Sequence, residues 1–110
     1  MKTKKAMKTS ELLSRYAVGQ RDFRGVILMG AQLKKVNLSY ADFSGADLRG
    51  ANLTAANLSY ANLQDATLTG ANFTEANLTK VNLSQTHIHD VNFSRANLRG
   101  AIMPDGVIQT

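Results

Sequence analysis

The chain has 110 residues, a length that fits one domain with a modest hydrophobic core. It contains no cysteine, which excludes a disulfide framework, a thiolate metal site and a cysteine nucleophile. The formal charge is +5, and residues 1–20 hold five basic side chains against one acidic, so the basic character is concentrated at one end.

Residues 1–9 are rich in lysine, and we interpret them as a basic disordered tail. No long apolar segment follows them, so neither a secretory signal nor a membrane span is expected. The absence of cysteine fits a reducing compartment, and we predict a cytoplasmic protein.

Residues 10–20 predict a short α-helix. Ser10 is the expected N-cap and Gly19 the expected C-terminal stop. The apolar residues between them recur at helical spacing and would form one face: Leu12, Leu13, Tyr16 and Ala17.

Residues 21–110 divide into 18 units of five residues without an insertion. All four phenylalanines and all eleven leucines after residue 20 stand at the central position, and all nine asparagines stand just before it. A period of five matches neither a strand nor a helix, so each unit must bend the chain. The first and central residues of each unit are the inward candidates, and turn-forming residues fill the other positions.

Units such as ADLRG at residues 46–50 and ANLTA at residues 51–55 follow the pattern A(N/D)LXX. This pattern resembles the pentapeptide-repeat family, and the segment from Leu12 to Phe23 resembles the openings of its cyanobacterial members. In that family each unit forms one side of a square coil. The resemblance therefore implies an all-β solenoid: a right-handed quadrilateral β-helix of about four and a half coils over residues 21–110. We number the sides one to four from residues 21, 26, 31 and 36, each recurring every 20 residues.

Stacking of residues 20 apart predicts the core. The predicted core side chains are Phe23, Phe43, Leu63 and Leu83 on side one, Leu48 and Leu68 on side two, Leu53, Phe73 and Phe93 on side three, and Leu58, Leu78 and Leu98 on side four. The phenylalanines pair within this register, and the side-four asparagines are expected to form a ladder of side-chain hydrogen bonds: Asn37, Asn57, Asn77 and Asn97.

A solenoid exposes an apolar cross-section at each end and needs covering there. The predicted helix would cover the first coil, where Ile27 and Met29 are apolar at outward positions. At the other end a Pro-Asp-Gly turn precedes the last unit, in which Ile108 is expected to continue side two. Two interpretations stay open for the apolar residues of this end, a self-covered terminus and an end-to-end homodimer contact such as the family contains: Ile102, Met103, Val107 and Ile108.

Two groups of outward residues are candidate sites. Tyr40 and Tyr60 should stack on side four with Lys80 continuing the column, either as a binding stripe or as a simple cross-coil contact. His87 and His89 flank the inward Ile88 beside Asp90, but positions around a bend point apart. We therefore predict no metal, no cofactor and no catalytic residue.

The other charged side chains predict a mixed, solubilising surface. We interpret the protein as a non-enzymatic scaffold for an unidentified protein partner. One alternative is a DNA mimic that binds a type II topoisomerase, as some family members do, but residues 21–103 carry a net charge of about +2. Another is nucleic-acid or anionic-surface binding through the basic start, which predicts a steep salt dependence. Nucleic acid is not the expected main partner.

Overall fold

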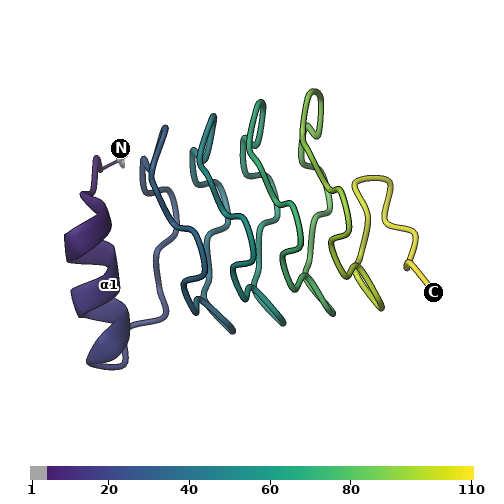
Figure 1. Ribbon diagram of the computed structural model, residues 1–110. Helices are drawn as coiled ribbons and strands as arrows, with labels where there is room; N and C mark the ends of the chain where they lie inside the picture. Colours follow the sequence, from purple (N-terminus) through teal and green to yellow (C-terminus); the bar gives the residue numbers. More distant parts are fainter. Residues whose placement is uncertain (1–4) are drawn as a thin grey trace.

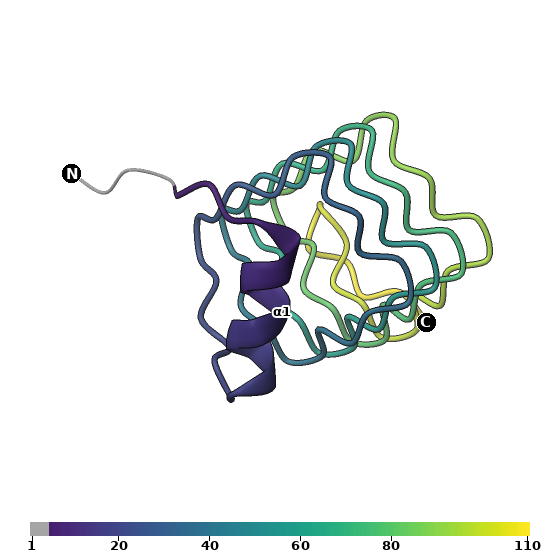
Figure 2. The ribbon, with the colours of Figure 1, turned by 60° about the vertical axis from the view of Figure 1, so that its left-hand side comes forward.

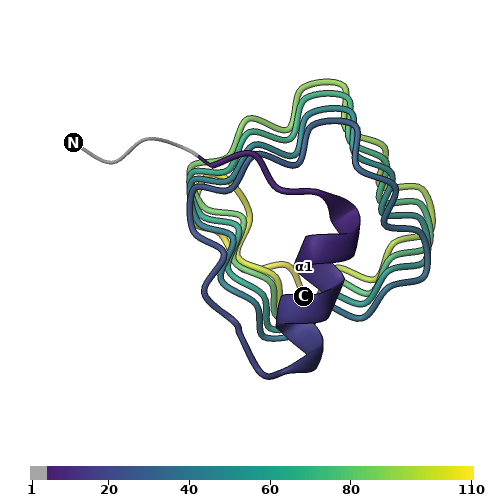
Figure 3. The ribbon, with the colours of Figure 1, turned by 90° about the vertical axis from the view of Figure 1, so that its left-hand side faces the viewer.

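The computed structural model describes residues 5–110. One α-helix, α1 (Thr9–Ala17), precedes a stack of coils (Figure 1). Within the described residues the coils pair through single parallel bridges that join residues 20 apart, as in the series Asn37, Asn57, Asn77 and Asn97. The same register holds on all four sides, so one coil takes 20 residues and the chain is a β-helix, square when viewed end-on (Figure 3).

Backbone hydrogen bonds tie each coil to the next. On side four the amide of Leu58 donates to the carbonyl of Asn77 at 2.8 Å, and the amide of Asn77 donates to the carbonyl of Ala56 at 2.9 Å. The amide of Tyr60 at the corner donates to Thr79 at 2.9 Å. Because these bonds run between coils, the position of every outward side chain is set by the ladder.

Each unit up to residue 100 ends in a residue with left-handed backbone. Gly50 has φ 67°, and Tyr60 takes φ 62° although a side chain makes this conformation costly by about 1–2 kcal/mol. The asparagine of the unit supports the turn, since Asn57 Oδ1 accepts a hydrogen bond from the amide of Ser59 at 3.0 Å. All four side-four asparagines bond in this way within their own units, which differs from the expected ladder between their amides: Asn37, Asn57, Asn77 and Asn97.

Alanines and leucines fill the interior in columns. Ten of the twelve predicted core side chains are buried, whereas Phe93 and Leu98 are only half-buried because no complete coil follows them. The predicted ring pairs are present. The centroids of Phe23 and Phe43 lie 5.5 Å apart and those of Phe73 and Phe93 lie 5.6 Å apart.

Helix α1 lies across the N-terminal end of the stack (Figure 2). It begins at Thr9 rather than after Ser10, and its N-cap, Lys8, makes no side-chain capping bond, so Ser10 is not the cap. Gly19, at φ 102°, follows the helix end as predicted. Leu12 is fully buried, and among the described residues no helix is long and apolar enough to cross a lipid bilayer.

Residues 5–7 differ from the expected disordered tail. The amide of Ile27 donates to the carbonyl of Lys5 at 2.8 Å, and the amide of Met7 donates to the carbonyl of Ile27 at 3.1 Å. The physical reason is the free edge of the first coil, whose backbone groups need partners. Met29 was expected to be covered but is 55% exposed. The rest of the predicted tail, residues 1–4, lies outside the described residues.

The C-terminal unit does not continue side two. Instead Ile108 pairs antiparallel with Ile102, and the amide of Met103 donates to the carbonyl of Val107 at 2.8 Å. The turn is closed by the amide of Gly106, which donates to the carbonyl of Met103 at 2.8 Å. The turn predicted at Pro-Asp-Gly is therefore present, but it reverses the chain and does not start a further half coil.

Candidate interaction surfaces

Tyr40 and Tyr60 form a stacked pair on the corner that ends side four. Their ring centroids lie 4.9 Å apart with an interplanar angle of 3°. The two residues are 63% and 50% exposed, respectively. The ladder sets this arrangement, because the amide of Tyr40 donates to the carbonyl of Ser59 at 3.0 Å. The pair is a fixed aromatic surface on the outside of the rod.

Lys80 occupies the next corner position but leans away from the tyrosines. A β-carbon at Gly100 would lie 3.1 Å from Lys80 Cε and 3.2 Å from its Cδ. The aliphatic part of Lys80 therefore packs beside Gly100, which has no side chain to obstruct it. Along this corner the two stacked rings are followed by the Lys80 side chain, which packs beside Gly100.

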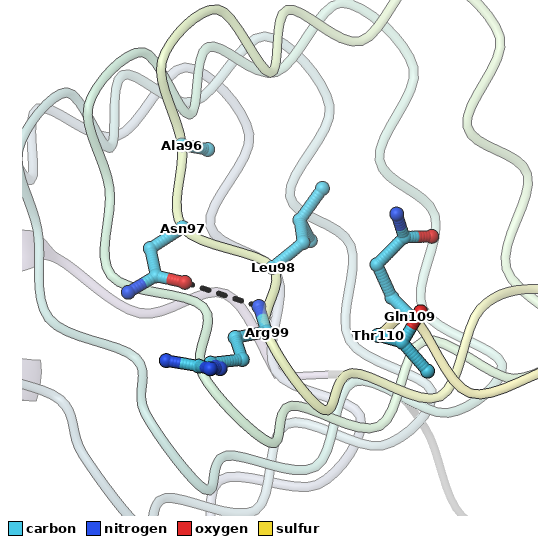
Figure 4. A pocket seen from close by; sticks show the side chains of 6 residues that line it. All are labelled: Ala96, Asn97, Leu98, Arg99, Gln109 and Thr110. Carbon is cyan, nitrogen blue, oxygen red and sulfur yellow. Dashed lines mark hydrogen bonds between the residues drawn. The ribbon is translucent and has the colours of Figure 1, made fainter.

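The C-terminal end retains exposed apolar residues. Val107 and Ile108 are each 60% exposed, while Ile102 and Met103 are half-buried by the returning segment. Figure 3 shows that segment crossing the last coil, in contrast to the helix at the other end. An open pocket of about 440 Å³ lies beside it (Figure 4), lined by Ala96, Asn97, Leu98, Arg99, Gln109 and Thr110.

The two histidines do not meet. His87 and His89 are both exposed on either side of the half-buried Ile88, and His89 Nε2 lies 3.3 Å from Asp90 Oδ2. Within residues 5–110 no three histidine, aspartate or glutamate side chains gather closely enough to hold a metal ion.

Two arginines of sides one and two, Arg24 and Arg49, are paired with aspartates. Arg49 makes two hydrogen bonds to the nearly buried Asp47, at 2.9 and 2.7 Å, and these bonds together with the aspartate charge raise the pKa of Arg49. Arg24 is held in the same way by Asp22 at 2.9 Å, which raises its pKa. These pairs were not predicted from the sequence. The paired residues are two positions apart, and their side chains lie on the same outer face because of how each unit bends.

The chain matches a known family over most of the repeat. The pentapeptide repeat region matches residues 20–93. A solved structure of alr5209, a pentapeptide repeat protein from Nostoc PCC 7120, is 32% identical with a TM-score of 0.86, covering 91% of this chain and 82% of that one. Such proteins form right-handed β-helices. No curated protein matches the chain.

Two further solved structures share the repeat. AT2G44920, from the thylakoid lumen of Arabidopsis thaliana, is 36% identical over 81% of this chain and 66% of that one, with a TM-score of 0.48. HetL, involved in heterocyst differentiation regulation in Nostoc sp. PCC 7120, is 30% identical over 80% of this chain and 55% of that one, with a TM-score of 0.35.

Proposed function

The chain belongs to the pentapeptide-repeat family, and from this we propose that it is a non-enzymatic scaffold that holds a protein partner on the corner formed by Tyr40, Tyr60 and Lys80. The observation that carries the proposal is the stacked tyrosine pair, at least half exposed on a rod whose other aromatic side chains are buried or half-buried. Exposed aromatic residues are enriched at protein interfaces and supply much of their binding energy.

The rigidity of the rod supports this use. The hydrogen-bonded ladder already orders the backbone of both tyrosines, and ring stacking restricts their side chains. A partner that binds them loses little conformational entropy in the protein, so more of the contact energy appears as affinity. A flat, preformed surface is what a scaffold needs.

Replacing both tyrosines tests the proposal. The double variant Tyr40→Ser/Tyr60→Ser is expected to weaken capture of a discrete protein partner from lysate by about tenfold or more, because aromatic anchors often contribute over 1 kcal/mol each. Capture is quantified at moderate salt after nuclease treatment, which removes partners held through nucleic acid.

The matched control is Asp65→Ser/Gln85→Ser. These residues are exposed, also close their units in adjacent coils, and have φ values of 61° and 58° like those of the tyrosines. Capture should be unchanged in the control. Equal loss in both variants, or capture of nucleic acid alone, would contradict the scaffold role.

A second proposal concerns the C-terminal end, where a specific observation favours self-association. Exposed Val107 and Ile108 lie beside half-buried Ile102 and Met103 at the end of the stack away from α1, and a second copy of the chain would cover them. We expect a homodimer that the variant Val107→Asp/Ile108→Asp converts to monomer in sedimentation velocity runs. The control is Val18→Asp, at an 85% exposed valine following α1, which should remain dimeric. A monomeric wild-type chain at high concentration would exclude this contact.

A further inference from the structure

The charges of the rod are divided between two pairs of sides. Sides three and four (residues 31–40, 51–60, 71–80 and 91–100) carry five cations and one anion, a formal net charge of +4. Sides one and two, together with the returning tail, carry three arginines and all six aspartates of the chain, a net charge of −3. The near-neutral total therefore conceals a basic half and an acidic half, and the tyrosine corner lies where the two halves meet.

The cations of the basic half are free to attract a partner. Within residues 5–110, four of them make no ion pair: Lys34, Lys35, Lys80 and Arg99. The fifth, Arg95, has only a long contact of 3.8 Å with Glu75. Two of the three arginines of the acidic half, Arg24 and Arg49, are by contrast already held by aspartates at hydrogen-bond distance.

The tyrosine geometry decides between two anionic partners. Single-stranded nucleic acid binds aromatic platforms by stacking its bases on them. A base cannot enter between rings whose centroids lie 4.9 Å apart. Backbone hydrogen bonds between the coils, such as that from the Tyr40 amide to the Ser59 carbonyl, hold the two rings at this spacing. The unpaired cations are also spread over the first, third and fourth coils rather than along one groove. Carboxylates on a folded or extended polypeptide suit such scattered donors better.

We propose that sides three and four, with the tyrosine pair at their border, form a docking surface for an acidic protein segment. This inference rests on the scaffold role proposed above and names the chemistry of its partner. The acidic residues of the partner would pair with Lys80 and Arg99 on the coils that follow the tyrosines, and with Lys34 and Lys35 in the first coil. Like charges on sides one and two would repel the same segment and so select the face.

Fluorescence anisotropy with a labelled peptide of alternating glutamate and serine tests the proposal. The full chain should bind this peptide at low salt and bind a glutamine–serine peptide much more weakly. The variant Lys80→Gln/Arg99→Gln should weaken binding by about three- to tenfold, since exposed ion pairs contribute roughly 0.2–1 kcal/mol each. The control Gln64→Glu/Gln85→Glu changes the net charge by the same amount but on the acidic half, and it should reduce binding by less than about twofold.

Three results would overturn the inference: no binding of the glutamate peptide, equal weakening in both charge variants, or tighter binding of an oligothymidylate of similar length. The two proposals fail separately. A partner captured through Tyr40 and Tyr60 but insensitive to Lys80→Gln/Arg99→Gln would leave the scaffold role intact and remove its acidic partner. Unchanged capture by the Tyr40→Ser/Tyr60→Ser variant would remove the scaffold role itself.

Discussion

Replacing Phe43 by alanine is expected to lower the free energy of unfolding by about 3–5 kcal/mol. Phe43 is 1% exposed, and its ring packs against that of Phe23 with 5.5 Å between the centroids. The hydrogen bonds of the coils above and below hold the backbone in place, so the walls cannot collapse into the space that the ring leaves. Chemical denaturation followed by far-ultraviolet circular dichroism measures the effect.

Phe43→Leu is the matched control for this cavity. Leucine occupies the central position in most other units, so the variant keeps an inward apolar side chain and should cost less than about 2 kcal/mol. An alanine variant as stable as the leucine variant would show that the core relaxes around the missing ring, and that the coil spacing is softer than the ladder implies.

Replacing Leu12 by alanine is expected to cost about 2–4 kcal/mol and to release α1 from the stack. Leu12 is the fully buried residue of the helix, and a nine-residue helix has little stability without its packing. The remaining anchors are polar: Tyr16 donates its hydroxyl hydrogen to the carbonyl of Ser39 at 2.8 Å, and Arg21 lies over the Tyr16 ring. Denaturation gives the change in stability.

Hydrogen exchange locates the change. In a solenoid each coil contacts only its neighbours, so the first coil should lose protection while the third keeps it. The amides of Met7 and Ile27, which pair the entering segment with the first coil, should exchange faster. Leu13→Ala, at the half-buried neighbouring position, is the control and should have a smaller effect. Uniform loss of protection along the rod would instead indicate a single cooperative unit.

The interior of the rod was predictable because the same five-residue pattern of apolar and polar residues recurs along the sequence. The units up to residue 100 keep one phase and place their central residues inward, and the pairing of Phe23 with Phe43 follows from a spacing of 20 residues. The same register predicted the stack of Tyr40 on Tyr60. Repetition makes each local error detectable against the other units, which is why these features could be derived without a structure.

The ends were less predictable because each occurs once. The pairing of Lys5 with Ile27 depends on unsatisfied backbone groups at an edge, which no side-chain pattern records. The reversal that pairs Ile108 with Ile102 depends on the backbone of one turn, although the residues before and after it stay in phase. The capping of α1 failed for a similar reason, since Ser10 carries the residue type of a cap but lies inside the helix.

The candidate site was predictable in its aromatic part only. A column position follows from counting, so the tyrosines could be placed together, whereas the freedom of Lys80 and Arg99 depends on what lies near them. An arginine in an ion pair, such as Arg49 with Asp47, is less available to a partner, and which arginines are paired depends on the three-dimensional placement of the side chains. The mixed surface expected from the sequence is thus a divided one.

The 20-residue register also limits how such a protein can change its length. An insertion or deletion of five residues keeps every later core side chain inward, yet it turns all later coils by one side. Had five residues been lost between Tyr40 and Tyr60, the two rings would stand on neighbouring corners and no stack would form. Only the insertion of whole coils lengthens the rod while preserving its faces. Insertions of any multiple of five residues therefore keep the core, whereas only multiples of 20 residues also keep the binding surface.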